Sequence, residues 1–237
     1  SGAQPPSYGL AAQTDDENLV VGEQVIPRVL ASCDVRDYGS GRGVSFSQSV
    51  NFALDHRSGL NDPRGQIGQN LFTDMHMLTV DERVIHDLAH CIKRCDLELA
   101  GVASSAYVSG ISSLVEDEQE LGAACIDLGG GTTSLSIFMK RHMIYADTIR
   151  IGGDHVTRDI SMGLQVPFAT AERIKTRHGG VIATGRDDMD MIEVGGNTGD
   201  WEHDRRSVSR AEVIGIMRPR IEEILEDVKD RLDAAGF

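Results

Sequence analysis

CIDLGGGTTSLSIF, residues 125–138, carries the strongest structural signal in this chain of 237 residues. A buried strand is expected to end at Leu128, and strand alternation resumes through Leu135 and Ile137 after three glycines. The glycines therefore predict the turn of a β-hairpin. A P-loop is excluded because no Gly-Lys-Ser or Gly-Lys-Thr follows. A Rossmann turn is excluded because a strand, not a helix, comes next.

The hairpin has the composition of a phosphate cradle. Gly129, Gly130 and Gly131 would let backbone N–H groups approach phosphate oxygens, and the Asp127 carboxylate could face Mg²⁺ through water. We include the two residues that complete the turn, Thr132 and Thr133, in the candidate site. A glycine hairpin of purely structural use is the alternative interpretation.

Two further features point to an anion. A strand is predicted to end at Gly152 and Gly153, where a helix begins and offers N–H groups and the positive end of its dipole. Glu172 and Lys175 lie three residues apart, hence on one face of the next helix. There the carboxylate could accept from ribose hydroxyls and the ammonium could approach a base or phosphates. Taken alone, this pair is more typical of an ordinary surface ion pair.

The charge and composition exclude several classes of protein. With 23 Lys and Arg against 37 Asp and Glu, the formal net charge is −14, which excludes a general nucleic-acid binder. No signal peptide or run of about 18 apolar residues occurs, so we expect neither a secreted nor a membrane-spanning chain. The cysteines form no metal-type pairs and indicate reduced thiols in a cytoplasm; they are Cys33, Cys91, Cys95 and Cys125.

The pattern before the hairpin predicts a compact α+β module. It consists of a helix over 22–33, strands over 47–54 and 71–80, and a helix that a capping box of Thr79 and Glu82 opens. Residues 100–115 are expected to be helical, and an acidic surface turn, EDEQE, follows.

The pattern after the hairpin mixes strands and helices. We expect a strand over 142–151, a helix over 155–164 and a helix capped by Thr170, followed by a polar loop around a short strand, MIEV. Ser209 and Glu212 are expected to open a long last helix, kinked by Pro219.

Three segments together resemble a known family. They are residues 83–138, GGDHVTRDI at 152–160, and AERIKTRHGG at 171–180. Their order is similar to the second nucleotide-binding half of the actin, sugar-kinase and DnaK-type chaperone superfamily, and within it to the FtsA-like bacterial cell-division proteins. The resemblance implies a partial actin-like ATPase fold of the α/β (α+β) class that binds ATP and Mg²⁺.

The same resemblance implies a division into subdomains. Residues 1–9 would be a remnant of subdomain IA, 10–98 the SHS2-like IC subdomain, and 99–120 a helix and linker of IA. Residues 121–237 would be IIA, with a IIB insertion over about 162–219. In the family, IC contributes polymer contacts and binds later division proteins, and IIB receives the C-terminal tail of FtsZ. Three arginines are the basic candidates for that tail: Arg210, Arg218 and Arg220.

The function implied is that of an assembly protein. It would polymerise, bind FtsZ, and tether the Z-ring to the cytoplasmic face of the inner membrane at the division site. We expect the sequence to be a piece of such a protein, lacking the first phosphate hairpin, the adenosine motif and the C-terminal amphipathic membrane helix, and hence binding ATP weakly. No catalytic base is assigned, so the protein would be at most a weak ATPase. A phosphotransferase of the same fold, such as a sugar kinase, is the alternative, although the Asp base it needs is not evident.

Two remaining features carry less chemistry. His86 and His90, with Cys91 nearby, imitate a metal pair, but the spacing lacks the glutamate of a zincin helix, so we favour a helix surface. Trp201 lies in a polar loop, as either a partner contact or a loop anchor.

Overall fold

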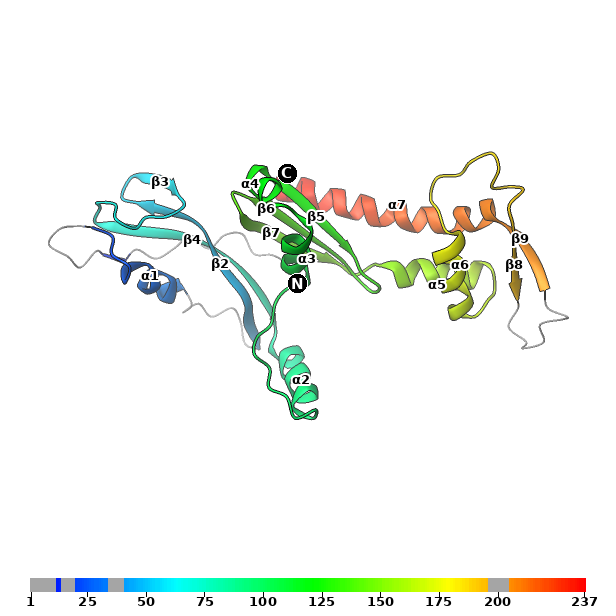
Figure 1. The fold of residues 1–237 in the computed structure, drawn as a ribbon, viewed down its shortest axis with the longest axis horizontal. Helices are drawn as coiled ribbons and strands as arrows, with labels where there is room; N and C mark the ends of the chain where they lie inside the picture. Colours follow the sequence, from blue (N-terminus) through cyan, green and yellow to red (C-terminus); the bar gives the residue numbers. More distant parts are fainter. Residues whose placement is uncertain (1–11, 14–19, 34–40, 196–204) are drawn as a thin grey trace. The chain divides into compact units, whose positions relative to one another are not determined.

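The protein has a mixed α/β fold, shown in Figure 1. The structure is a computed structural model and describes residues 12–13, 20–33, 41–195 and 205–237. Its internal contacts divide the chain into two compact units. The first unit comprises Ser1–Asp127 and Leu135–Asp147, and the second unit comprises Leu128–Ser134 and Thr148–Phe237.

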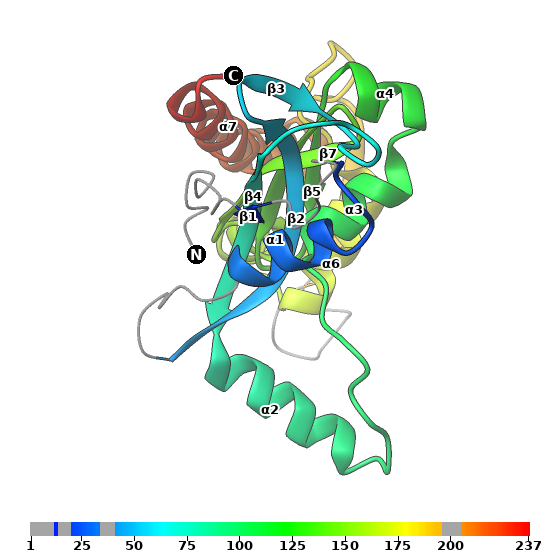
Figure 2. The same cartoon turned by 90° about the vertical axis from the view of Figure 1, so that its left-hand side faces the viewer.

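The first unit is built on a four-stranded antiparallel sheet. Its strands lie in the order β1 (Ala12–Gln13), β4 (Asn70–Asp81), β2 (Arg42–Leu54), β3 (Arg57–Leu60). Helix α1 (Val25–Cys33) lies along one face of this sheet, as Figure 2 shows. Alternate strand residues point to opposite faces, so one set meets α1 in a buried core. That core consists of Val21, Val25, Val29, Phe52, Leu54 and Leu71.

The opposite face of the sheet carries Phe46 and Leu78, which pack against α3 (Ser105–Ser113) and strands β6 (Thr133–Met139) and β7 (His142–Ile149). Gly110 permits the close approach of α3, since a Cβ at this position would lie 2.1 Å from Cε2 of Phe138. This packing joins the sheet to residues 105–127 and 135–147 within the first unit.

Helix α2 (Glu82–Lys93) begins differently from the expectation. Its N-cap is Asp81, whose carboxylate accepts from the Arg83 N–H at 3.0 Å. The Thr79 hydroxyl instead accepts from Nε of Arg42 at 3.0 Å, so the predicted capping box was wrong. The helix contains no buried residue, and its apolar side chains Val84 and Leu88 are exposed.

The expected acidic surface turn was also wrong, because these residues form helix α4 (Glu116–Leu121). Glu118 explains why a helix forms here: its side chain accepts from the Val115 N–H at 3.0 Å and satisfies a free donor at the helix start. Helix α3 begins at Ser105, five residues later than the helix expected over 100–115.

A three-stranded sheet follows in the order β5 (Ala123–Leu128), β6, β7. The predicted glycine hairpin between β5 and β6 is confirmed by the bond from the Gly129 N–H to the Thr132 carbonyl, 3.0 Å long. Strand β5 alternates between half-buried and exposed residues, so the expectation of a buried strand was wrong. The turn from β6 to β7 places Lys140 and Arg141 at φ values of 51° and 65°, in the left-handed region of a tight hairpin turn.

The second unit contains three helices and a small hairpin. They are α5 (Gly153–Gly163), α6 (Phe168–His178), β8 (Met191–Gly195), β9 (Arg205–Ser209) and α7 (Arg210–Ala235). Their shared core includes Val156, Ile160, Leu164, Ile174, Ile192, Val208 and Val213. Strand β9 was not anticipated, although the short strand at MIEV was.

The two helix caps predicted for the second unit have different outcomes. Ser209 caps α7 as expected, with its hydroxyl accepting from the Glu212 N–H at 3.2 Å. Thr170 does not cap α6, which begins two residues earlier, after Pro167. Trp201 falls outside the described residues. None of the helices in the described ranges is long and apolar enough to cross a membrane.

Candidate functional site

The glycine hairpin presents unused hydrogen-bond donors. Within the part of the chain that the structure describes, the backbone N–H groups of Gly130, Gly131 and Thr132 donate to no acceptor. All three residues are exposed. Consecutive free N–H groups in a tight turn form a concave site for an anion.

Thr133 has a different role from its neighbours. Its side chain is fully buried, and its hydroxyl donates to the carbonyl of Ile151 at 2.7 Å. The bond ties the start of β6 to the turn that precedes α5. Thr133 therefore holds the hairpin in place and does not present its side chain to a ligand.

The start of α5 packs directly on the hairpin. The N–H of Gly153 donates to the Gly129 carbonyl at 2.9 Å, and the N–H of Asp154 donates to the Gly130 carbonyl at 2.8 Å. A Cβ on Gly152 would lie 2.5 Å from both carbonyl oxygens. The N–H group of Gly153, which we expected to be free, is thus already used, as is that of Asp154. The Gly152 N–H donates to Nδ1 of His155 at 3.2 Å, so neither glycine offers a free donor to an anion, and this glycine pair supports the hairpin.

Asp154 is a site residue that the sequence interpretation missed. Its carboxylate lies beside Gly130, where a Cβ would meet Oδ2 at 3.2 Å. A carboxylate beside free N–H groups is a suitable group to face a hydrated cation that accompanies phosphate. Its position directly after two glycines at a predicted helix start is the signal that could have identified it.

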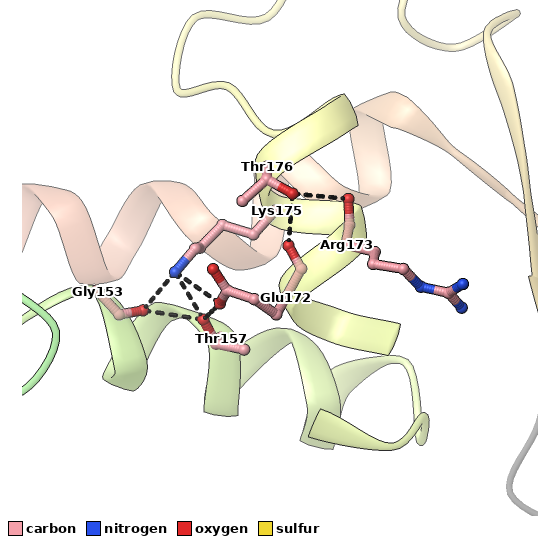
Figure 3. A network of polar contacts seen from close by, with 6 residues as sticks. All are labelled: Gly153, Thr157, Glu172, Arg173, Lys175 and Thr176. Carbon is pink, nitrogen blue, oxygen red and sulfur yellow. Dashed lines mark hydrogen bonds and ion pairs between the residues drawn. The ribbon is translucent and has the colours of Figure 1, made fainter. Parts of the chain in front are cut away.

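Glu172 and Lys175 belong to a network between α6 and α5 (Figure 3). Nζ of Lys175 lies 2.8 Å from Oε2 of Glu172, 2.8 Å from the Thr157 hydroxyl and 3.1 Å from the Gly153 carbonyl. The Thr157 hydroxyl donates to the same Glu172 oxygen at 2.5 Å. An ammonium has three donors, so these contacts account for all of them.

The network is partly shielded from solvent, with the Lys175 side chain 20% exposed. The hydrogen bond from Lys175, and then that from Thr157, hold the pKa of Glu172 below its ordinary value. Lys175 contacts Gly153, and Gly153 in turn contacts Gly129. The structure therefore brings the hairpin, the glycine pair and the Glu172–Lys175 pair together in the second unit.

Asp127 lies in the first unit, at the end of β5. Its Oδ2 accepts from the hydroxyl of Ser109 on α3 at 2.8 Å. This bond orients the carboxylate. Among the described residues no group of three or more His, Cys, Asp and Glu side chains forms a metal cluster, and this includes His86, His90 and Cys91.

The three arginines considered for partner binding each have an acidic neighbour. Arg210 contacts Asp187 at 3.2 Å, Arg218 contacts Glu222 at 2.7 Å, and Arg220 contacts Asp159 at 2.7 Å. The hydrogen bond to Asp159 raises the pKa of Arg220. A partner carboxylate would have to compete with these contacts.

Two family models match most of the chain. The model of "Cell division protein FtsA" matches residues 124–233, and that of the "SHS2 domain inserted in FTSA" matches residues 2–79.

Curated relatives agree with these models. The chain is 39% identical over 211 residues to the cell division protein FtsA of Agrobacterium fabrum, covering 89% of the chain and 47% of the relative. It is 30% identical over 221 residues to the FtsA of Bacillus subtilis, covering 93% of the chain and 50% of the relative. The chain thus spans about half the length of the relatives it matches.

Solved structures show the same fold class. MreB5 of Spiroplasma citri, solved bound to ADP, aligns with a TM-score of 0.53 at 20% identity, covering 65% of the chain and 47% of MreB5. A PilM–PilN type IV pilus biogenesis complex aligns with a TM-score of 0.55 at 9% identity, covering 97% of the chain and 55% of that structure's chain. These similarities support an actin-like fold.

Proposed function

Because the chain belongs to the FtsA family of cell-division proteins, we propose that it contributes a nucleotide-responsive half of an actin-like division protein. The protein would bind ATP with Mg²⁺ and polymerise. It would also bind the C-terminal tail of FtsZ, tether the Z-ring to the cytoplasmic membrane and recruit later division proteins.

The three free N–H groups of Gly130, Gly131 and Thr132 carry the nucleotide proposal. Donors on adjacent residues can share the oxygens of one phosphate group, and they need no lysine to do so. The bonds from Gly153 and Asp154 to the hairpin carbonyls fix this backbone in advance. A preorganised site loses less entropy when its ligand binds.

Asp154 and Glu172 supply the acidic groups of the proposed site. The Asp154 carboxylate beside Gly130 could face a hydrated Mg²⁺, which bound phosphates normally accompany. Glu172 remains 41% exposed and can accept further hydrogen bonds, as from ribose hydroxyls. The phosphate groups of bound ATP would carry the negative charge that holds the Mg²⁺ between them and Asp154. We assign no catalytic base, so the proposal concerns binding and assembly.

Amide NMR tests the phosphate site at the affinity expected of a weak binder. We expect titration with Mg·ATP to shift the backbone amide signals of Gly130, Gly131 and Thr132 before those of other residues. Inorganic triphosphate with Mg²⁺ should shift the same signals, whereas adenosine alone should not. Shifts confined to other segments, or none up to about 10 mM, tenfold above a 1 mM Kd, would overturn the proposed phosphate site.

A matched pair of variants isolates charge from shape. A Cβ at Gly131 meets nothing within 4 Å, so Gly131→Asp and Gly131→Asn should both fold. The added carboxylate should weaken Mg·ATP binding by roughly tenfold or more because it repels phosphate, while the amide should change binding only slightly. Equal affinities for the two variants would contradict binding at this hairpin.

The partner proposal has its own test. A fluorescent FtsZ C-terminal tail peptide should show increased anisotropy with this chain, and Arg218→Ala should reduce the increase more than Lys229→Ala, a change on the same helix. A coupled assay with sugars is run in parallel. Turnover of any sugar without peptide binding would favour the phosphotransferase instead.

A further inference from the structure

A cavity of about 280 Å³ lies in the first unit, apart from the glycine hairpin. It is bounded by strands β2 and β4 on one side and by the end of β6, its turn and β7 on the other. Its lining includes Asn51, Asn61, Asp74, His76 and Lys140, with Val50, Met139 and Ile144 as the apolar part.

His76 is the unusual member of this lining. Its side chain is only 2% exposed, yet neither ring nitrogen has a hydrogen-bond partner among the described residues. Its cross-strand neighbour Gln48 likewise has a buried Oε1 without a partner in that part of the chain. A buried polar group without a partner costs roughly 1–3 kcal/mol, so such groups are normally satisfied by protein, water or ligand.

The imidazole is suited to a neutral contact. Burial lowers the pKa of His76, so at neutral pH the ring offers one donor and one acceptor. The ring centroids of Phe46 and His76 lie 6.3 Å apart in an edge-to-face arrangement.

The same cavity has opposite charges in its lining. Asp74 accepts from Nδ2 of Asn51 at 3.5 Å, a long bond that leaves carboxylate capacity unused. The Lys140 ammonium forms no hydrogen bond or ion pair with the residues that the structure describes. An occupant that carries both charges and an apolar side would complement every part of this lining.

We propose that the cavity binds a small zwitterion with an apolar side chain, of the size of a free amino acid or dipeptide. Its ammonium contacts Asp74, its carboxylate contacts Lys140, and a polar atom contacts His76. The apolar side chain packs on Val50, Met139 and Ile144. The volume of about 280 Å³ favours such a small molecule, because pockets for larger ligands generally exceed roughly 300 Å³.

Histidine-selective NMR labelling of the 237-residue chain tests this with L-leucine as the probe. The chain has eight histidines, so the other seven serve as internal references. We expect leucine to shift the ring signals of His76 with saturation. Leucinamide lacks the carboxylate and N-acetyl-leucine lacks the ammonium, so each should bind roughly tenfold more weakly than leucine.

Two variants separate binding from folding. Lys140→Asn keeps the left-handed turn, which asparagine tolerates, and should weaken leucine binding by roughly tenfold. Arg141→Asn in the same turn is the matched control, because Arg141 pairs with Glu116 and Glu120 and does not line the cavity. His76→Leu should abolish binding while leaving the chain at least as resistant to urea as the unsubstituted protein.

The outcomes are distinct. Saturable shifts at His76 that Lys140→Asn weakens and Arg141→Asn does not would establish the site. No shift at His76 with leucine up to about 10 mM, or equal binding of leucine and its two analogues, would overturn the proposal. The test needs no nucleotide, because none of the residues that line the cavity belongs to the glycine hairpin.

Discussion

Gly152 is the residue whose replacement has the most predictable consequence. A Cβ there would lie 2.5 Å from the carbonyl oxygens of Gly129 and Gly130 and 2.8 Å from the backbone nitrogen of Thr132. Backbone atoms cannot move aside as a flexible side chain can. Gly152→Ala should therefore lower the free energy of unfolding by about 1–3 kcal/mol, measured by urea unfolding. Gly131→Ala, which meets nothing within 4 Å, is the control, and an equal loss in both would refute the close packing.

His76 makes the stability of the first unit depend on pH. Burial lowers its pKa from the ordinary value of 6.5. Below about pH 6.5 the unfolded chain therefore binds a proton that the folded chain excludes, so the free energy of unfolding falls as pH falls toward the folded-state pKa. Asp74 and Lys140 are the charged residues that line the same cavity.

Urea unfolding at several pH values between about 5 and 8 measures that dependence. Burial lowers the pKa of His142 as well, so both histidines make the free energy of unfolding depend on pH. His76→Leu should therefore reduce the slope of the free energy of unfolding against pH, and the slope that remains should come from His142. A slope that His76→Leu leaves unchanged would show that His76 does not exclude a proton in the folded chain.

Among the helices and strands, α7 gives a simple test of capping. The Ser209 hydroxyl accepts from the Glu212 N–H at 3.2 Å. Ser209→Ala should lower stability by about 1 kcal/mol, since an N-cap satisfies one of the free donors at a helix start. Ser207→Ala, an exposed position on β9, should change it little, and comparable losses in both would argue against the cap.

Helices α5 and α6 are joined by the Lys175 contacts to Gly153, Thr157 and Glu172. Lys175→Met keeps much of the side-chain volume and removes all three, so hydrogen exchange at both helices should accelerate. The lowered pKa of Glu172 adds a pH effect. Its stabilising contribution is present above its ordinary pKa of 4.5 and is lost as pH falls through the folded-state value. In Lys175→Met this contribution should be smaller, because only the Thr157 hydrogen bond still lowers the pKa of Glu172.

The accuracy of the predictions depended on whether a signal was local. The glycine hairpin and the Ser209 cap followed from adjacent residues and are confirmed. Asp81 replaced Thr79 as a cap because its carboxylate competes for the same helix start, while Arg42 from a neighbouring strand uses the Thr79 hydroxyl. Tertiary contacts of this kind have no signature in a local pattern.

The candidate site shows the same limit. The sequence indicated free N–H groups at Gly152 and Gly153, because a helix start leaves them unsatisfied. The hairpin carbonyls at Gly129 and Gly130 satisfy the donors of Gly153 and Asp154 instead, and no sequence pattern showed that these two segments touch. The acidic composition, by contrast, is visible in the sequence and governs behaviour at the scale of the whole chain.

A net charge of −14 opposes the self-association we propose. Copies of the chain repel one another at low ionic strength because they carry the same net charge. Salt screens this repulsion, since the Debye length at about 0.3 M salt is shorter than the roughly 10 Å found at 0.1 M. Sedimentation velocity should therefore show assembly that strengthens as sodium chloride rises from about 0.05 to 0.3 M, and also as pH falls toward the pI near 4.9. Assembly that weakens with salt would mean instead that complementary charges hold the copies together.

The variant Lys229→Glu makes the net charge more negative by two. Comparing its assembly with that of the unsubstituted chain separates general charge repulsion from the loss of a local contact. A small uniform shift is expected from general repulsion, and complete loss of assembly would place Lys229 in a contact.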